Sequence, residues 1–394
     1  VLKRDPKNAG ALINTAALYE VKGKKDDAVT YYNKARETGE PTAFLAFANY
    51  YMRNKDWSKA VSVLDEGIKA NPKNAQAMEF KGRIYIGEKK YKEALGAFEA
   101  LEAVNKDYAL PFIVNTHIAM GEHQKALEKL NEKIKSDPRR MDLMADVSRV
   151  YVLMKDYKSA ADNARKIINI KPDSADGYIV LAGVYESKND LDGAIEELSK
   201  GAAIDRKSLG AGMLLGGMYL KKGDNAQAMK AYEDVTKRNS NYIPAIFAQA
   251  TVYDMTGNKK EAIKRYRGII EKSENHAPAL NNLAYLYAEG YGSKEDALKL
   301  ATRAYTLEPG NAGIMDTLGY VLLKNARYDE ARTLLERSVS AAPNNPSTLY
   351  HAALVYVQQG EKAKAIESLQ KAIGIGAFPG ADNAKHLLDK LKKG

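Results

Sequence analysis

The sequence contains no cysteine, and it has no apolar run of the ~18 residues that a membrane-spanning helix needs. Without cysteine the chain forms neither disulfides nor thiolate metal sites, an absence that fits an oxidising and a reducing compartment equally. No signal peptide is visible, but the opening "VLKRDPKNA" matches the repeat end "VLDEGIKANPKNA" at residues 63–75. We therefore expect residues 1–8 to be the end of a truncated repeat of a longer protein, so the missing leader leaves localisation open.

Charge of one sign is not concentrated in any segment. The net charge is +10, but lysine and arginine alternate with acidic residues, as in "NDLDGAIEELSKG" at residues 189–201. This pattern is typical of solvated helix faces. Because no basic block with interleaved aromatic residues and no nucleic-acid module is present, we predict no nucleic-acid partner.

Residues that carry chemistry are also few. No two of the five histidines lie four residues apart, and none belongs to an H-E-x-x-H motif, so no zinc site is expected. The glycine-rich stretch "GAGMLLGGMYLKKG" at residues 210–223 has the register of a helix and not of a phosphate-binding loop. We predict a chain that is not an enzyme and that binds no metal and no cofactor.

A column of alanines recurs through nearly the whole chain at steps of 32 to 35 residues. Numbering this alanine as position 20 of a 34-residue unit gives a small residue at position 8 in nearly every unit and a tyrosine at position 11 in most. Proline occupies position 32 in several units. A fixed period of this length indicates an array of repeats. The alanines are Ala28, Ala60, Ala94, Ala126, Ala160, Ala194, Ala228, Ala262, Ala297, Ala331 and Ala365.

The spacings within one unit predict two helices packed as a hairpin. Positions 4, 7 and 11 share one face of the first helix, and positions 20, 24 and 27 share one face of the second. Small residues at 8 and 20 let the helices approach closely, and the proline ends the second helix. One hairpin leaves an apolar face uncovered, so stability requires stacking on neighbours.

This pattern resembles the tetratricopeptide repeat. The resemblance covers residues 9–380 in eleven units and implies an all-α fold, an α-solenoid wound as a right-handed superhelix. Residues 381–394 are expected to form a C-terminal capping helix. The fourth unit departs from the pattern at Val114 and His117, which we expect to be packed in the core, and the ninth unit has one extra residue in "AEGYGSKEDA".

A narrower resemblance lies near the C-terminus. Three stretches are similar to the tail of bacterial PEP-CTERM system TPR-repeat lipoproteins. They are "ALNNLAYLYAE" at residues 279–289, the stretch from "GIMDTLGYVLLKNARYDEA" to "ESLQKAI" at residues 313–373, and the closing "AFPGADNAKHLLDKL". Those proteins are associated with exopolysaccharide production and protein sorting. The resemblance implies a periplasmic or membrane-anchored setting in the bacterial envelope in preference to the cytoplasm.

Partner binding is expected on the concave face, which the first helices line with positions 5, 9 and 12. No unit has the Lys-at-5 and Asn-at-9 pair of the family's carboxylate clamp, so binding of chaperone tails is not expected. Units six to eight present an apolar strip, for which burial in repeat packing and a binding groove are equal alternatives. Units nine to eleven present mainly polar and aromatic residues. The candidate groove residues are Arg149, Ile179, Gly183, Met213, Gly217, Leu220, Phe247, Asn281, Tyr285, Asp316, Tyr320 and Tyr350.

Gly217 is the centre of this hypothesis. Glycine inside a helix costs about 1 kcal/mol relative to alanine, so a groove-facing glycine needs a reason. Its missing side chain would leave a pocket floor between Ile179, Met213, Leu220 and Phe247, where an apolar anchor of the partner could dock. Arg149, Asn281 and Tyr285 would fix the orientation of that partner.

The leading functional hypothesis is a non-catalytic scaffold that binds a protein or peptide in an envelope assembly for polysaccharide secretion or protein sorting. An alternative is a targeting or regulatory array of a larger protein, whose catalytic domain, such as a glycosyltransferase, lies outside this sequence. A third is direct binding of an acidic polysaccharide, motivated by the positive charge. The sequence identifies neither the partner nor the oligomeric state.

The alanine column generates a stability prediction. Replacing Ala160 or Ala228 by leucine should overpack the hairpin and lower the free energy of unfolding by about 1–3 kcal/mol. Chemical denaturation of both variants measures this loss. Unchanged stability in both would show that the repeat register is wrong.

Overall fold

The computed structural model describes residues 1–393, and every regular element in that range is a helix. The predicted all-α solenoid is confirmed, because the helices pack as consecutive hairpins. The elements are α1 (Ala9–Val21), α2 (Lys25–Arg36), α3 (Pro41–Arg53), α4 (Trp57–Ala70), α5 (Ala75–Gly87), α6 (Tyr91–Val104), α7 (Lys106–Ala119), α8 (His123–Ser136), α9 (Met141–Leu153), α10 (Tyr157–Ile170), α11 (Asp176–Ser187), α12 (Leu191–Ile204), α13 (Leu209–Lys222), α14 (Asn225–Arg238), α15 (Ile243–Met255), α16 (Lys259–Lys272), α17 (Ala277–Leu286), the π-helical turn η1 (Tyr287–Tyr291), α18 (Lys294–Leu307), α19 (Ala312–Lys324), α20 (Tyr328–Ala341), α21 (Pro346–Gln358), α22 (Lys362–Ile375) and α23 (Ala381–Lys393).

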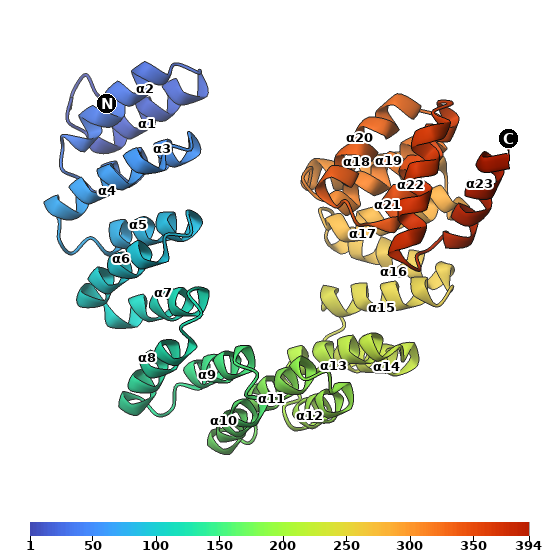
Figure 1. Ribbon diagram of the computed structural model, residues 1–394, viewed down its shortest axis with the longest axis horizontal. Helices are drawn as coiled ribbons and strands as arrows, with labels where there is room; N and C mark the ends of the chain where they lie inside the picture. Colours follow the sequence, from blue (N-terminus) through green and yellow to red (C-terminus); the bar gives the residue numbers. More distant parts are fainter. Residues whose placement is uncertain (394) are drawn as a thin grey trace. The chain divides into compact units, whose positions relative to one another are not determined.

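The chain divides into two compact units, Val1–Gly201 and Ala202–Gly394. Within the first unit, Figure 1 shows the first helices α3, α5, α7 and α9 on one side and the second helices α4, α6, α8 and α10 on the other. Each unit therefore has a first-helix face and a second-helix face. The right-handed superhelix stays a prediction.

The alanine column forms the interior of every hairpin. All eleven alanines lie in second helices and have no exposed surface. A methyl group is the largest side chain that this register accepts when two helix backbones pack closely. The sequence register is therefore confirmed.

Position 8 of the first helix complements position 24 of the second. Gly82 faces Phe98, and a Cβ on Gly82 would lie 2.3 Å from that ring. Gly216 faces Tyr232 at the same 2.3 Å. Real Cβ atoms do not approach a ring this closely, so these two hairpins need glycine at position 8 for the ring positions that they have.

A left-handed residue ends the first helix in ten of the eleven hairpins. It lies five residues before the alanine. The residue that follows it donates a backbone hydrogen bond to the carbonyl of position 11, as in Asp56 N–H to Tyr51 O at 2.9 Å after Lys55. This bond satisfies a carbonyl that the helix end leaves unpaired. The left-handed residues are Gly23, Lys55, Lys89, Gly121, Lys155, Asn189, Gly223, Gly257, Ala326 and Gly360.

The ninth hairpin differs because of its extra residue. The end of its first helix widens into the π-helical turn η1, and Gly290 takes a φ of 99°. A π-turn absorbs one inserted residue without moving the flanking helix out of register. The insertion therefore changes the position of Glu289 and leaves Ala297 buried in its column.

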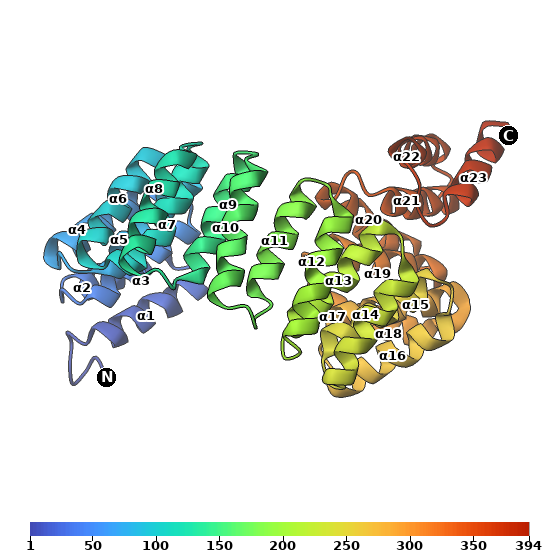
Figure 2. The same ribbon diagram turned by 90° about the horizontal axis from the view of Figure 1, so that it is seen from below.

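The last helix covers the C-terminal hairpin. Figures 1 and 2 both show α23 beside α21 and α22. Its residues Leu387, Leu388 and Leu391 pack with Phe378 against the buried core around Leu369. Residue 394, the end of the predicted capping helix, lies outside the described residues.

Two adjacent glycines of α13 give a matched stability test. Gly216→Ala should lower the free energy of unfolding by about 1–3 kcal/mol, because the methyl group would overlap the Tyr232 ring. Gly217→Ala should raise it by up to ~1 kcal/mol, since no atom lies within 4 Å of its Cβ position and alanine favours the helix. Urea denaturation compares the two; equal effects would contradict the packing.

Candidate functional site

The predicted groove residues fall in both compact units. Arg149, Ile179 and Gly183 lie on the first-helix face of the first unit, in α9 and α11. The remaining nine lie on the first helices of the second unit. Each group is a surface of its own.

The residues of the first unit line one continuous groove between α9 and α11. Its C-terminal part has a volume of about 270 Å³ and includes all three predicted residues. Its N-terminal part has a volume of about 500 Å³ and reaches Arg139 and Met141. The two parts share Ala145, Ile179 and Val180 as lining. The full lining is Arg139, Met141, Asp142, Ala145, Ser148, Arg149, Val152, Ile167, Asp176, Ile179, Val180, Gly183, Val184 and Ser187.

The groove exists because small residues occupy both helices where α9 faces α11. Ala145 occupies position 5 on α9, and Gly183 occupies position 9 on α11, where no atom lies within 4 Å of its Cβ position. Aliphatic side chains such as Ile179 and Val180 form the floor. Arg149 stands at the rim, where its guanidinium donates to Asp146 at 2.9 Å and to Asn115 at 3.3 Å.

The apolar residues of the second unit are engaged in packing on one side. Met213 and Leu220 are half-buried against the core that contains Tyr232 and Val252. The Phe247 ring lies 5.7 Å from the Tyr266 ring. Gly217 faces open space, as the sequence analysis expected of a groove position. The predicted pocket floor around it stays a prediction.

The polar and aromatic residues of units nine to eleven converge on His351 of α21. The Tyr320 ring stacks on the His351 ring at 4.2 Å, and the Tyr285 ring stacks on Tyr320 at 5.5 Å. The Tyr350 ring centroid lies 6.0 Å from that of His351. We call Tyr285, Tyr320, Tyr350 and His351 the aromatic cluster.

Two carboxylates complete this arrangement. Asp316 Oδ1 lies 2.9 Å from His351 Nδ1, and Glu289 Oε1 accepts a hydrogen bond from the Tyr320 hydroxyl. The same Glu289 oxygen lies 3.7 Å from the ammonium of Lys324. The three first helices α17, α19 and α21 thus share one network of rings and charges.

The side chains of this network are more deeply buried than the sequence pattern predicted. Asp316 and Tyr320, predicted to point into a groove, are only 8% and 6% exposed, and His351 is 4% exposed. The reason is that α19 contacts both α17 and α21 and that the rings of Tyr285, Tyr320 and His351 stack across these contacts. Tyr285, Tyr350 and Asn281 keep partial exposure.

Burial and negative charge both act on the tyrosines. Burial, followed by the charges of Glu289 and Asp316, raises the pKa of Tyr285 from 10.0 to about 12. Burial and a hydrogen bond to Glu289 raise the pKa of Tyr320 further. Burial and Glu289 also raise the pKa of Tyr350. Side chains with shifted pKa values concentrate at functional sites, and structural networks of charges produce such shifts as well.

Two members of this network were not among the predicted groove residues. His351 adjoins Tyr350 at position 6, which was not among the positions expected to face the groove. Glu289 is displaced by the extra residue of the ninth unit. The length anomaly of that unit was the available signal for Glu289, because an insertion in a regular array marks a local change of backbone.

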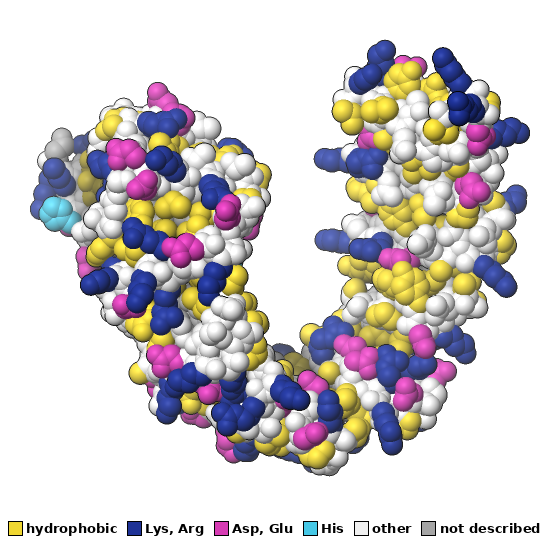
Figure 3. Space-filling model, turned by 180° about the vertical axis from the view of Figure 1, so that it is seen from behind, with side chains coloured by type: hydrophobic (Ala, Val, Ile, Leu, Met, Phe, Trp, Pro, Cys, Tyr) yellow, Lys and Arg dark blue, Asp and Glu magenta, His cyan; other side chains and the backbone are white. Residues whose placement is uncertain are grey.

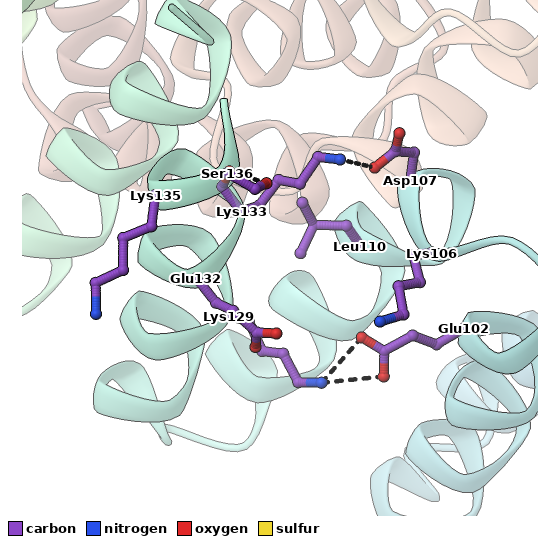
Figure 4. Close-up of a pocket in the computed structure, with 9 residues that line it drawn as sticks. All are labelled: Glu102, Lys106, Asp107, Leu110, Lys129, Glu132, Lys133, Lys135 and Ser136. Carbon is purple, nitrogen blue, oxygen red and sulfur yellow. Dashed lines mark hydrogen bonds and ion pairs between the residues drawn. The ribbon is translucent and has the colours of Figure 1, made fainter. Parts of the chain in front are cut away.

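A second kind of hollow lies on the second-helix face, between α6, α7 and α8. This pocket of about 470 Å³ is lined by charged residues, with Lys129 paired to Glu102 at 2.9 Å and Lys133 to Asp107 at 2.5 Å (Figure 4). Lys135 points away from the other lining residues in the same view. Exposed pairs of this kind contribute about 0–1 kcal/mol each, and the pocket has the character of a solvated helix surface.

The structure provides observations on charge distribution, metal binding and membrane insertion. On the face in Figure 3, lysine and arginine are interspersed with acidic side chains, as the sequence pattern predicted. Among residues 1–393, no group of three histidine or acidic side chains is placed to hold a metal ion. No helix in the same range is both long and apolar enough to cross a bilayer.

The raised tyrosine pKa values generate a pH prediction. A folded pKa of about 12 against 10.0 means that Tyr285 stabilises the fold below pH 10 and that this stabilisation is lost as pH rises through 12. Tyr285→Phe should remove one late-titrating phenol and weaken the alkaline loss of stability. Tyrosinate absorbance and denaturation against pH measure both; an unchanged alkaline titration would contradict the assignment.

Two family models match the chain. Residues 48–253 match the tetratricopeptide repeat protein 21 N-terminal ARM repeat, and residues 317–382 match a tetratricopeptide repeat. None of the curated proteins matches the sequence.

Among solved structures, the APC/C hetero-tetramer Cut9-Hcn1 is similar with 14% identity and a TM-score of 0.52, over 98% of this chain and 96% of that one. The yeast Tom70 structure shares 15% identity over the same fractions, with a TM-score of 0.46. At this identity the Cut9-Hcn1 similarity shows the fold alone. Because the first family model covers just over half of the 394 residues, the chain belongs to the tetratricopeptide-repeat family, with an N-terminal region of the repeat protein 21 type.

Proposed function

We propose that this protein is a scaffold that binds a protein or peptide segment on its first-helix face. The observation that carries the proposal is the groove between α9 and α11, which is apolar along its floor and polar at its rim. Grooves of this composition are the usual form of a peptide site. Family membership supports it, since tetratricopeptide-repeat proteins bind protein partners.

The dimensions of the groove fit a short peptide. Its lining on α9 runs from Met141 to Val152, which corresponds to about 16 Å at a rise of about 1.5 Å per residue. An extended peptide of about five residues spans that distance at roughly 3.3 Å per residue. Aliphatic side chains of the partner would contact Ile179 and Val180, and the rim guanidiniums of Arg139 and Arg149 would bind its polar groups.

The chemistry of the groove supports binding without catalysis. Its two carboxylates are already bonded to neighbours, Asp142 to Arg140 at 2.7 Å and Asp176 to Ser174 at 2.8 Å. No nucleophile adjoins a base among the lining residues. A scaffold whose affinity comes from shape and apolar contact requires neither a nucleophile nor a base.

The proposed setting is a bacterial envelope assembly. It is supported only by the similarity of residues 279–289, 313–373 and 377–391 to PEP-CTERM system lipoproteins. Its test is fractionation of host cells that express the complete gene product. Recovery in the soluble cytoplasmic fraction would contradict it.

Filling the groove tests the binding function. Gly183→Leu places four carbons in the groove without removing any contact, since its Cβ position has no neighbour within 4 Å. Peptides selected from a random display library on the wild-type chain should lose at least about tenfold in affinity for this variant, equivalent to about 1.4 kcal/mol. Fluorescence anisotropy with a selected peptide measures the change.

The matched control is Gly96→Leu on the second-helix face. Gly96 is also an exposed mid-helix glycine of the first unit with no neighbour within 4 Å of its Cβ position. Both substitutions favour the helix, so thermal stability should not fall in either. A selected peptide that binds both variants equally, or a library that yields no binder, would refute the groove as the binding site.

A further inference from the structure

The aromatic cluster of the second unit has polar groups that the fold does not use. Glu289 directs only Oε1 to Tyr320 and Lys324, and its Oε2 has no hydrogen-bond partner in residues 1–393. The hydroxyls of Tyr285 and Tyr350 also form no hydrogen bond within the described part of the chain. The Glu289 side chain is 38% exposed, so its free oxygen is accessible.

Carboxylates act on all three tyrosines of the cluster. Glu289 raises the pKa of Tyr285, Tyr320 and Tyr350, and no cation is among the causes that act on any of the three. Asp316 and Asp254 add to the effect at Tyr285.

Lys324 shows what chemistry the cluster accepts. Its ammonium lies 5.0 Å from the centroid of the Tyr320 ring and 3.7 Å from Glu289. This is the geometry of a cation held between an aromatic face and a carboxylate. Lys324 engages the Tyr320 ring and Glu289 Oε1, and in residues 1–393 no cation lies over the rings of Tyr285 and Tyr350, the second of which also packs against Phe378 at 6.0 Å.

We propose that the aromatic cluster binds an arginine side chain from a basic segment of a partner protein, with the guanidinium on the Tyr285 and Tyr350 rings and bonded to Glu289 Oε2. A guanidinium is planar, stacks on aromatic rings and carries five donors. A lysine ammonium has three donors and no plane, so it fits the stacked part of this site less well. The π-helical turn η1 is the structural cause, because it positions the Glu289 carboxylate beside the rings.

This inference rests on the proposed function, since both place the partner on first-helix faces, but it concerns other residues and another chemistry. The groove between α9 and α11 binds apolar side chains, whereas the cluster binds a cation. Gly183→Leu should leave arginine binding unchanged. The two proposals can therefore fail separately.

The test is an NMR titration of the full chain with isotope-labelled tyrosine rings. N-acetylarginine methylamide should shift the Tyr285 and Tyr350 signals in a saturable manner. The citrulline analogue, which has the same shape and no charge, should cause no shift. The lysine analogue should bind several-fold more weakly, because it forms fewer bonds to the same acceptors.

Glu289→Gln should weaken arginine binding about tenfold, as expected for the loss of a charge-assisted hydrogen bond. Glu271→Gln in α16 is the matched control: it removes the same charge from an exposed second-helix position and should change nothing. Tyr350→Phe keeps the ring, removes an unbonded hydroxyl and should fold normally while weakening binding a few-fold.

The tyrosine spectrum also reports whether each variant is folded. Equal shifts with arginine and citrulline would overturn the proposal, as would no saturable shift with the wild-type chain. Equal affinities of Glu289→Gln and Glu271→Gln would overturn it as well.

Discussion

The close approach of the two helices in each hairpin is the constraint on which the rest of the structure depends. An alanine with no exposed surface occupies every second helix, and position 8 of the first helix is alanine or glycine in most hairpins. Gly82 with Phe98 and Gly216 with Tyr232 fill the same space that Ala16 and Tyr32 fill in the first hairpin. Packing at interior density leaves no freedom at these positions. Variation is therefore confined to the outward side of the first helices, where partner binding is expected.

The same constraint explains why the extra residue of the ninth hairpin changes the backbone only at the end of the first helix. The second helix of the ninth hairpin cannot shift, because Ala297 must stay in its column. The insertion is absorbed in η1, and Glu289 is moved into contact with Tyr320 of the next hairpin. A regular array thereby acquires one place where a carboxylate, a lysine and stacked rings meet. A perfectly periodic sequence would not produce it.

The two compact units present different chemistries on their first-helix faces. In the first, the small residues Ala145 and Gly183 leave an open apolar seam with guanidiniums at its rim. In the second, contact of α19 with both α17 and α21 encloses Asp316 and His351 and leaves rings and a carboxylate oxygen at the surface. An apolar segment suits the seam and a cation suits the rings.

The sequence by itself determined the fold class, the hairpin register and the buried alanine column, because a period of about 34 residues with small residues at fixed positions is compatible with one local packing. It also identified Arg149, Ile179 and Gly183 as residues of one face, since helical periodicity decides which side chains share a side. Only the tertiary structure decided that Asp316 and Tyr320 are enclosed, and that His351 and Glu289 belong with them. Those outcomes depend on how closely successive first helices pack and on where a π-turn absorbs an extra residue. Both are set by contacts between hairpins, which the pattern within one repeat does not contain.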